Sequence, residues 1–285
     1  MATSKTPAKT DVAVAASTAV ATYDYGDDAT GFEGMTSKDY AIPYLQLLQA
    51  MSPELKDNRS LKMGDIINTV TGEIFPGDEG IAFIPCFWDH NYVEWVPRDK
   101  GGGLVGKHAL DSDVVAHAKA KAGTEFGKLQ TPEGNDLIET RYAYGLAIEA
   151  DGAANPAVIS FSSTKLKVAR NWITKAAGIQ IPHPSGVRKQ APLPSHRYRL
   201  RVTTEKNSKG EFYNWAGVVF DGESAADVRM GPQDPLYIQA KDLRKMIESG
   251  ALKAADDSLK PGGADDGGGE GGGGNGGAPG GKPVF

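Results

Sequence analysis

The stretch His196–Thr204 reads HRYRLRVTT and alternates strictly between two kinds of side chain. Its even positions from 198 to 202 carry tyrosine, leucine and valine, whereas its odd positions from 197 to 201 carry three arginines. Because successive side chains of a strand point to opposite faces, this alternation predicts a strand with one apolar and one basic face. A turn is expected over residues 205–210, where Asn207 and Gly210 can take a positive φ, and residues 211–220 (EFYNWAGVVF) predict the returning strand of a hairpin.

Further strand candidates precede this hairpin. The apolar run 80–88 predicts a core strand, and residues 91–96 predict its hairpin partner across Asp89-His90-Asn91. Three more strands are expected at residues 64–70, 137–150 and 157–161. Segment 39–50 is open to two interpretations, because Pro43 suits the first turn of a short helix but the segment could also run extended into the sheet.

Three helices are predicted among these strands. Residues 111–121 begin with acidic and end with basic side chains, as the helix dipole favours. Residues 165–177 place apolar side chains on one stripe, and residues 235–249 follow Asp234 as a candidate N-cap. The pattern predicts a β-rich α+β fold, and an OB-like Greek-key barrel with helical insertions and disordered termini fits it. The order of the strands is not determined by the sequence.

The chain divides into three parts by composition. Residues 1–35 are expected to be disordered, residues 36–252 to form the OB-like domain, and residues 253–285 to form a disordered, acidic, glycine-rich tail. Neither a signal peptide nor a membrane-spanning segment is expected. The single cysteine, Cys86, excludes an internal disulfide and suits the cytoplasm. Since Cys86 lies in an apolar run, it is expected to be buried.

The charges are segregated along the chain. The net charge is −5, with 31 basic and 36 acidic residues. Between Phe161 and Gly210, however, there are 11 lysines and arginines and one acid, Glu205. This segment therefore carries +10, and the remainder carries −15. Such segregation favours a basic binding face flanked by acidic segments.

Binding of single-stranded nucleic acid needs cations along the phosphates and aromatic faces for the bases. The segment from Phe161 to Phe220 has both kinds of residue, and alternate arginines on one strand would be about 6.6–6.8 Å apart. Tyr198 is expected in the core, and Tyr213 and Trp215 are expected to be more open. The candidate DNA-binding residues are Lys165, Lys167, Arg170, Trp172, Lys175, Arg188, Lys189, Arg197, Arg199, Arg201, Tyr213 and Trp215.

The tail carries a resemblance to a known family. Residues 261–285 are mostly glycine with scattered acids and end in Pro283, Val284 and Phe285. This layout resembles the acidic C-terminal tails of bacterial and phage single-stranded DNA-binding proteins, whose tips recruit replication enzymes. The resemblance implies that these three residues bind replication or recombination proteins. Lys282 departs from the pattern, because those tails usually stay acidic up to the tip.

Two pieces of the body resemble phage replication-region proteins. They are residues 40–43 (YAIP) with 64–66 (GDI), and residues 163–167 (STKLK) with 170–172 (RNW). This resemblance implies a phage origin.

Catalytic motifs are missing from the sequence. There is no HExxH, CxxC or Walker-type phosphate loop, and Gly222-Glu223-Ser224 does not complete a nucleophile elbow. We therefore expect no enzyme, cofactor or metal, but a protein that binds single-stranded DNA in phage replication, recombination or repair. A homo-oligomer stays open. The alternatives are a virion or scaffold protein with a basic face and, second, a metal-dependent nuclease.

Overall fold

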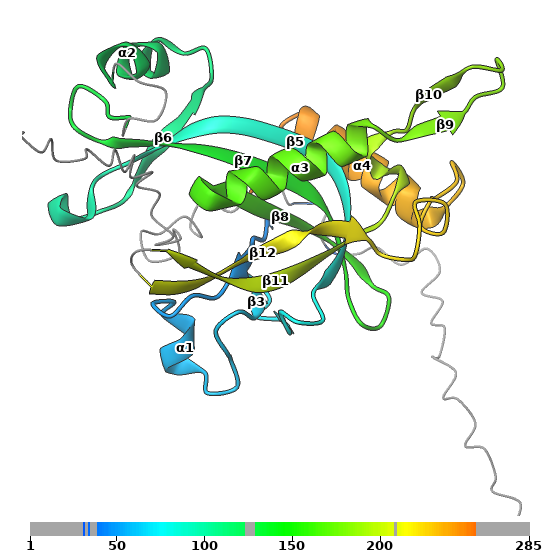
Figure 1. The fold of residues 1–285 in the computed structure, drawn as a ribbon, viewed down its shortest axis with the longest axis horizontal. Helices are drawn as coiled ribbons and strands as arrows, with labels where there is room; N and C mark the ends of the chain where they lie inside the picture. Colours follow the sequence, from blue (N-terminus) through cyan, green and yellow to red (C-terminus); the bar gives the residue numbers. More distant parts are fainter. Residues whose placement is uncertain (1–30, 32–33, 35–38, 123–128, 208–209, 255–285) are drawn as a thin grey trace, which may run out of the picture. The chain divides into compact units, whose positions relative to one another are not determined.

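The computed structural model describes residues 31, 34, 39–122, 129–207 and 210–254 (Figure 1). The chain divides into two units, Met1–Met35 and Thr36–Phe285, each with contacts mainly within itself. Every helix and strand named below belongs to the second unit. The predicted tail tip and most of the predicted N-terminal segment lie outside the described residues.

A large antiparallel sheet forms the centre of the fold, which confirms the β-rich α+β prediction. Its strands lie in the order β12-β11-β5-β7-β8, and β6 pairs with β5 on the edge opposite β7. Their bounds are β5 Ile81–Trp95, β6 Leu104–Ala109, β7 Asp136–Ile148, β8 Ala154–Ser162, β11 Tyr198–Asn207 and β12 Gly210–Phe220. The predicted hairpin is present as β11 and β12, with Tyr198 opposite Phe220 and a register shift between Leu200 and Val202.

The predicted hairpin turn at residues 89–91 is wrong. Strand β5 runs straight through these residues and pairs with β7 along this whole stretch, with His90 opposite Arg141. The polar side chains are satisfied within the sheet, because the Nε2 of His90 lies 2.9 Å from Glu139 Oε1 and the Nδ2 of Asn91 donates to Asp89 at 2.6 Å. A polar triplet without glycine or proline therefore continues the strand.

Segment 39–50 is extended, as the second interpretation proposed. It contains β1 (Ala41–Ile42) and β2 (Leu45–Leu47), and β2 forms a small antiparallel sheet with β3 (Ile66–Asn68) and β4 (Ile74–Phe75). Strand β1 pairs in parallel with β13 (Lys253–Ala254), so two residues assigned by composition to the tail form a strand.

The small sheet is tied to both sides of the large one. On one side, the backbone N–H of Val158 in β8 donates to the Pro43 carbonyl at 2.9 Å. On the other side, the N–H of Val202 in β11 donates to the Gly77 carbonyl at 2.9 Å. The two sheets thus enclose a common core, an arrangement compatible with an OB-like barrel.

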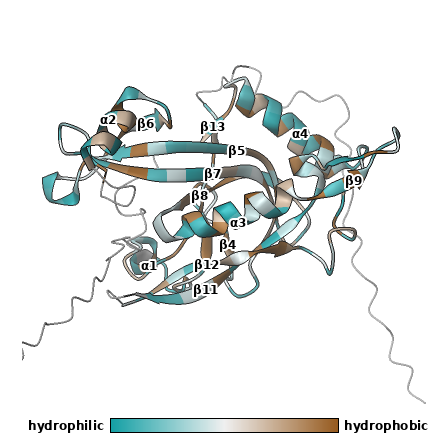
Figure 2. Ribbon diagram, turned by 45° about the horizontal axis from the view of Figure 1, so that its top comes forward, coloured by the Kyte–Doolittle hydropathy of each residue, from teal (hydrophilic) through white to brown (hydrophobic). Residues whose placement is uncertain are grey.

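Helices cover both faces of the large sheet (Figure 1). Helix α3 (Leu166–Ala177) packs on one face, where Trp172 and Phe83 belong to the first hydrophobic core. Helix α4 (Pro235–Glu248) packs on the other, and its Leu243 belongs to a second core with Cys86. Cys86 is buried as expected, and burial raises the pKa of its thiol to about 12. Figure 2 shows hydrophilic and hydrophobic residues alternating along α3, as expected for a helix with one buried side.

The helix predictions at residues 111–121, 165–177 and 235–249 are confirmed within two residues at each end. Helix α2 spans Asp113–Ala122, and the side chain of Asp234 accepts the N–H of Leu236 at the start of α4, at 2.9 Å. The smaller elements are α1 (Glu54–Asp57), a two-stranded ribbon of β9 (Gln180–Pro182) and β10 (Arg188–Gln190), and three 3-10 turns at Arg98–Lys100, Ser163–Lys165 and Leu193–Ser195. Among the described residues, no helix is both long enough and apolar enough to cross a membrane.

Candidate nucleic-acid interface

The basic face of β11 forms as the alternation predicts. Tyr198 and Leu200 point into the first core and are fully buried, which confirms the expectation for Tyr198. Burial raises the pKa of the Tyr198 phenol to about 12. Arg199 is half-buried and Arg201 is exposed on the opposite face. The hairpin therefore holds its arginines outside because its apolar side chains are fixed inside.

Asp221 organises this row of arginines. It directly follows β12, and its backbone N–H donates to the carbonyl of Arg197 at 3.2 Å. One carboxylate oxygen accepts the Nε–H of Arg197 at 2.5 Å, and the other accepts the Nε–H of Arg199 at 2.6 Å. The Asp221 side chain is only 12% exposed, whereas those of Arg197 and Arg199 are 35% and 32% exposed. A largely buried carboxylate thus holds two partly exposed guanidinium groups.

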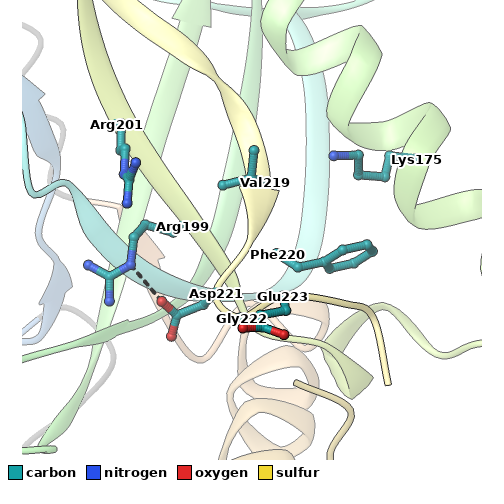
Figure 3. Close-up of a pocket in the computed structure, with 8 residues that line it drawn as sticks. All are labelled: Lys175, Arg199, Arg201, Val219, Phe220, Asp221, Gly222 and Glu223. Carbon is teal, nitrogen blue, oxygen red and sulfur yellow. Dashed lines mark hydrogen bonds and ion pairs between the residues drawn. The ribbon is translucent and has the colours of Figure 1, made fainter. Parts of the chain in front are cut away.

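An open hollow of about 510 Å³ lies beside this group (Figure 3). We call it the basic hollow, and it is lined by Lys175, Arg199, Arg201, Val219, Phe220, Asp221, Gly222 and Glu223. Figure 3 shows Arg199 and Arg201 on one side of the hollow and Lys175, from α3, on the other. The two acids leave one net positive charge among these residues, and Arg197 beside them adds a second.

Lys175 is fixed at its side of the basic hollow. Its Nζ donates to the backbone carbonyl of Val218 at 2.9 Å and lies 5.4 Å from the centroid of the Phe220 ring. Phe220 in turn stacks on Tyr198, with centroids 5.4 Å apart and an interplanar angle of 28°. The ammonium group of Lys175 therefore lies against the Phe220 ring, which itself packs on Tyr198 of the hydrophobic core, and Lys175 stays exposed.

The other predicted cations lie outside the lining of the basic hollow. Lys167 and Arg170 are exposed on α3, and Arg188 and Lys189 are exposed on the β9–β10 ribbon. Lys165 is only 6% exposed and so presents little surface to a ligand. Figure 1 shows the ribbon projecting beyond the end of α3, so the basic segment is spread over a hairpin, a helix and a ribbon.

The predicted stacking tryptophans are in the core. Trp172 is 1% exposed and Trp215 is 2% exposed, so the expectation that Trp215 is open is wrong. Trp172 sits at the middle of an aromatic cluster, with ring centroids 5.1 Å from Trp88 and 5.5 Å from Tyr198. Tyr213 is half-buried and packs on the same core. No base can stack on either tryptophan without displacing these neighbours.

Sequence reasoning missed Asp221 and Phe220 as parts of the site. The signal available was the hairpin register, because a pairing that starts near Asn207 and Gly210 carries the end of the second strand alongside Arg197. Among the described residues, no group of three or more histidine, cysteine, aspartate or glutamate side chains is arranged to hold a metal ion.

A β-rich α+β fold with an arginine row on its hairpin defines a candidate anion-binding protein. The chain matches the model of a family described as Pam3 phage gp34-like protein over residues 10–253, and it belongs to this family. The match covers most of the chain and supports the phage origin that the sequence analysis expected. Neither a curated protein nor a solved structure matches the chain.

Proposed function

We propose that this phage protein binds single-stranded DNA without sequence preference, in DNA replication, recombination or repair. The observation that carries the proposal is that Arg199, Arg201 and Lys175 line one hollow together with Phe220. Cations arranged along a surface neutralise phosphates, and an adjacent aromatic face can contact a base. We propose a binding protein rather than an enzyme, without a cofactor.

The spacing of the arginines supports this assignment. Side chains two residues apart on β11 repeat at about 6.6–6.8 Å, close to the phosphate spacing of an extended single strand. Arg197, Arg199 and Arg201 would thus each approach a neighbouring phosphate or share one between two residues. None of these contacts depends on the identity of a base, so the expected binding is indifferent to sequence.

Base stacking would rest on fewer residues than the sequence suggested. Phe220 lines the basic hollow and is partly exposed, whereas Trp172 and Trp215 are committed to the core. An engaged base typically contributes about 1–3 kcal/mol. We therefore assign the larger share of the binding free energy to the cations, with Lys167, Arg170, Arg188 and Lys189 extending the contact along α3 and the ribbon.

Fluorescence anisotropy with labelled oligo-dT tests the proposal. We expect binding at low salt that weakens steeply between about 50 mM and about 200 mM salt, because each phosphate contact releases a counterion. A mixed-sequence strand should bind equally well. Failure to bind any strand at low salt would refute the proposed function, and magnesium-dependent cleavage of the strand would indicate a nuclease instead.

The tail is proposed to recruit partners. Pro283, Val284 and Phe285 lie outside the described residues, so this proposal rests on the resemblance to single-stranded DNA-binding proteins and on sequence. Deleting these three residues should leave oligo-dT binding intact and abolish capture of replication or recombination proteins from infected cells. Capture that survives the deletion would exclude the tip as the recruiting element. We place this activity in the host cytoplasm.

A further inference from the structure

The pairing of Arg197 and Arg199 on one carboxylate has a definite geometry. Each arginine uses only its Nε–H toward Asp221. In Arg199, one terminal nitrogen, Nη1, also donates to the carbonyl of Glu79, at 3.2 Å. The described residues provide no hydrogen-bond acceptor for the terminal nitrogens of Arg197 or for Nη2 of Arg199. A guanidinium group carries five N–H donors, so most of the donors of this pair are free for a ligand.

The carboxylate is itself held in place, so it can orient the arginines. The Asp221 side chain is almost buried, and its backbone N–H is bonded to the carbonyl of Arg197. The N–H of Arg197 in turn donates to the carbonyl of Val228 at 3.2 Å. Three adjoining segments therefore fix the position of the carboxylate relative to the first arginine, and the carbonyl of Glu79 fixes the second.

We propose that Asp221 is a positioning residue that makes Arg197 and Arg199 into a clamp for one phosphodiester group. This inference rests on the proposed function. It assigns a role in DNA binding to Asp221, whose side chain is negatively charged as the phosphate of the ligand is. Terminal N–H groups of the two arginines would bind the two non-bridging oxygens of one phosphate, as guanidinium groups bind oxyanions. Asp221 would stay in place beneath them and contact no DNA.

This role predicts an effect opposite in sign to simple electrostatics. Removing a negative charge next to a DNA site should strengthen binding if only the total charge matters. If Asp221 orients the clamp, its removal should weaken binding in spite of the added positive charge. Glu223 provides the matched control, because it lines the same basic hollow, is exposed and has no arginine partner among the described residues.

The experiment compares Asp221→Asn with Glu223→Gln in oligo-dT anisotropy over a salt series. We expect Asp221→Asn to bind about three- to tenfold more weakly than the unmodified protein. The slope of log affinity against log salt concentration should also fall, by the amount expected for the loss of about one phosphate contact. Glu223→Gln should bind equally or more tightly. A thermal melting curve of each variant establishes that the compared proteins are folded at the assay temperature.

A second pair keeps the test decisive if Asp221→Asn does not fold. Arg199→Lys keeps the charge but loses the planar group that Asp221 orients, whereas Arg201→Lys makes the same change at an arginine outside the clamp. We expect only Arg199→Lys to weaken binding. Equal effects of the two lysine variants, or tighter binding by Asp221→Asn, would overturn the clamp while leaving the proposed function standing. An unmodified protein that binds no strand would overturn both.

Discussion

The side-chain amide of Gln49 forms two hydrogen bonds with the backbone of Tyr213. The Nε2 of Gln49 donates to the Tyr213 carbonyl at 2.7 Å, and its Oε1 accepts the Tyr213 N–H at 3.0 Å. The amide therefore satisfies the edge of β12 as a neighbouring strand would. Lys175 satisfies the Val218 carbonyl further along the same strand. Side chains of Gln49 and Lys175 thus satisfy backbone groups of Tyr213 and Val218 on this edge of the hairpin.

Replacing Gln49 by glutamate should destabilise the protein. The carboxylate keeps an acceptor for the Tyr213 N–H but cannot donate to the Tyr213 carbonyl, which leaves an unsatisfied group at a partly buried edge. We expect a loss of about 1–3 kcal/mol, measured by urea unfolding. Gln190→Glu, at an exposed position of the ribbon, is the control and should unfold as the unmodified protein does. Equal unfolding midpoints for the two variants would show that the Gln49 pairing contributes nothing.

Mutation of Trp215 should change the stability of the protein but not its affinity for DNA. Trp215→Ala empties a core site and should cost about 3–5 kcal/mol of unfolding free energy. Trp215→Phe, which keeps most of the apolar volume, should bind oligo-dT as tightly as the unmodified protein at temperatures where both are folded. A clear loss of affinity in the phenylalanine variant would return Trp215 to the binding surface.

Arg201→Ala should weaken DNA binding but leave the stability of the protein unchanged. Arg201 is exposed in the basic hollow, so its removal should leave the unfolding free energy within about 0.5 kcal/mol of the unmodified value. The salt slope of oligo-dT binding should fall by about one contact. Lys241→Ala removes the same charge from an exposed position of α4 and should leave the slope unchanged. If both variants lower the slope equally, binding follows total charge rather than this surface.

The two strands of the hairpin show what the sequence could predict and where it could not. The basic and apolar faces of β11 were predicted because a half-buried strand alternates with a period of two. Along β12 this period breaks, since Trp215 and Val218 both face the core although they are three residues apart. A register shift accompanies the break, and Gly217 adopts a φ of 93°. A glycine inside a strand is the signal of a bulge that would have predicted the burial of Trp215.

The site itself depended on pairings that are distant in sequence. Asp221 reaches Arg197 across 24 residues, and the small sheet meets β8 through Pro43 and Val158. The contact between Pro43 and Val158 follows from strand order, which a single sequence does not determine. The contact between Asp221 and Arg197 follows from a hairpin register that shifts between Leu200 and Val202. Local patterns therefore predicted the helices and most strands, whereas the carboxylate that organises the arginines came only from the structure.

Stability should depend on pH through Glu73. Burial, then a hydrogen bond with Glu149 and the charges of Glu149 and Asp151, raise the pKa of Glu73 from 4.5 to about 7. Between these values the folded chain keeps a proton that the unfolded chain has released, so the free energy of unfolding falls as pH rises from about 4.5 to about 7. Glu73→Gln should therefore gain melting temperature relative to the unmodified protein across this window. A constant difference in melting temperature at all pH values would contradict this assignment.

Gly145 should tolerate no side chain, because a Cβ there would collide with the neighbouring strand β5 of the central sheet. It pairs with Pro85, where β5 has a register shift. A Cβ at Gly145 would lie 2.1 Å from the Ile84 carbonyl oxygen and 2.6 Å from the Phe83 ring, both fixed by the core. Gly145→Ala should therefore cost several kcal/mol, because backbone or core must move. Gly106 in β6 is the matched control, since a Cβ there would meet nothing within 4 Å. Gly106→Ala should unfold at the same denaturant concentration or slightly higher, and equal loss in both variants would refute this account of the β5–β7 pairing.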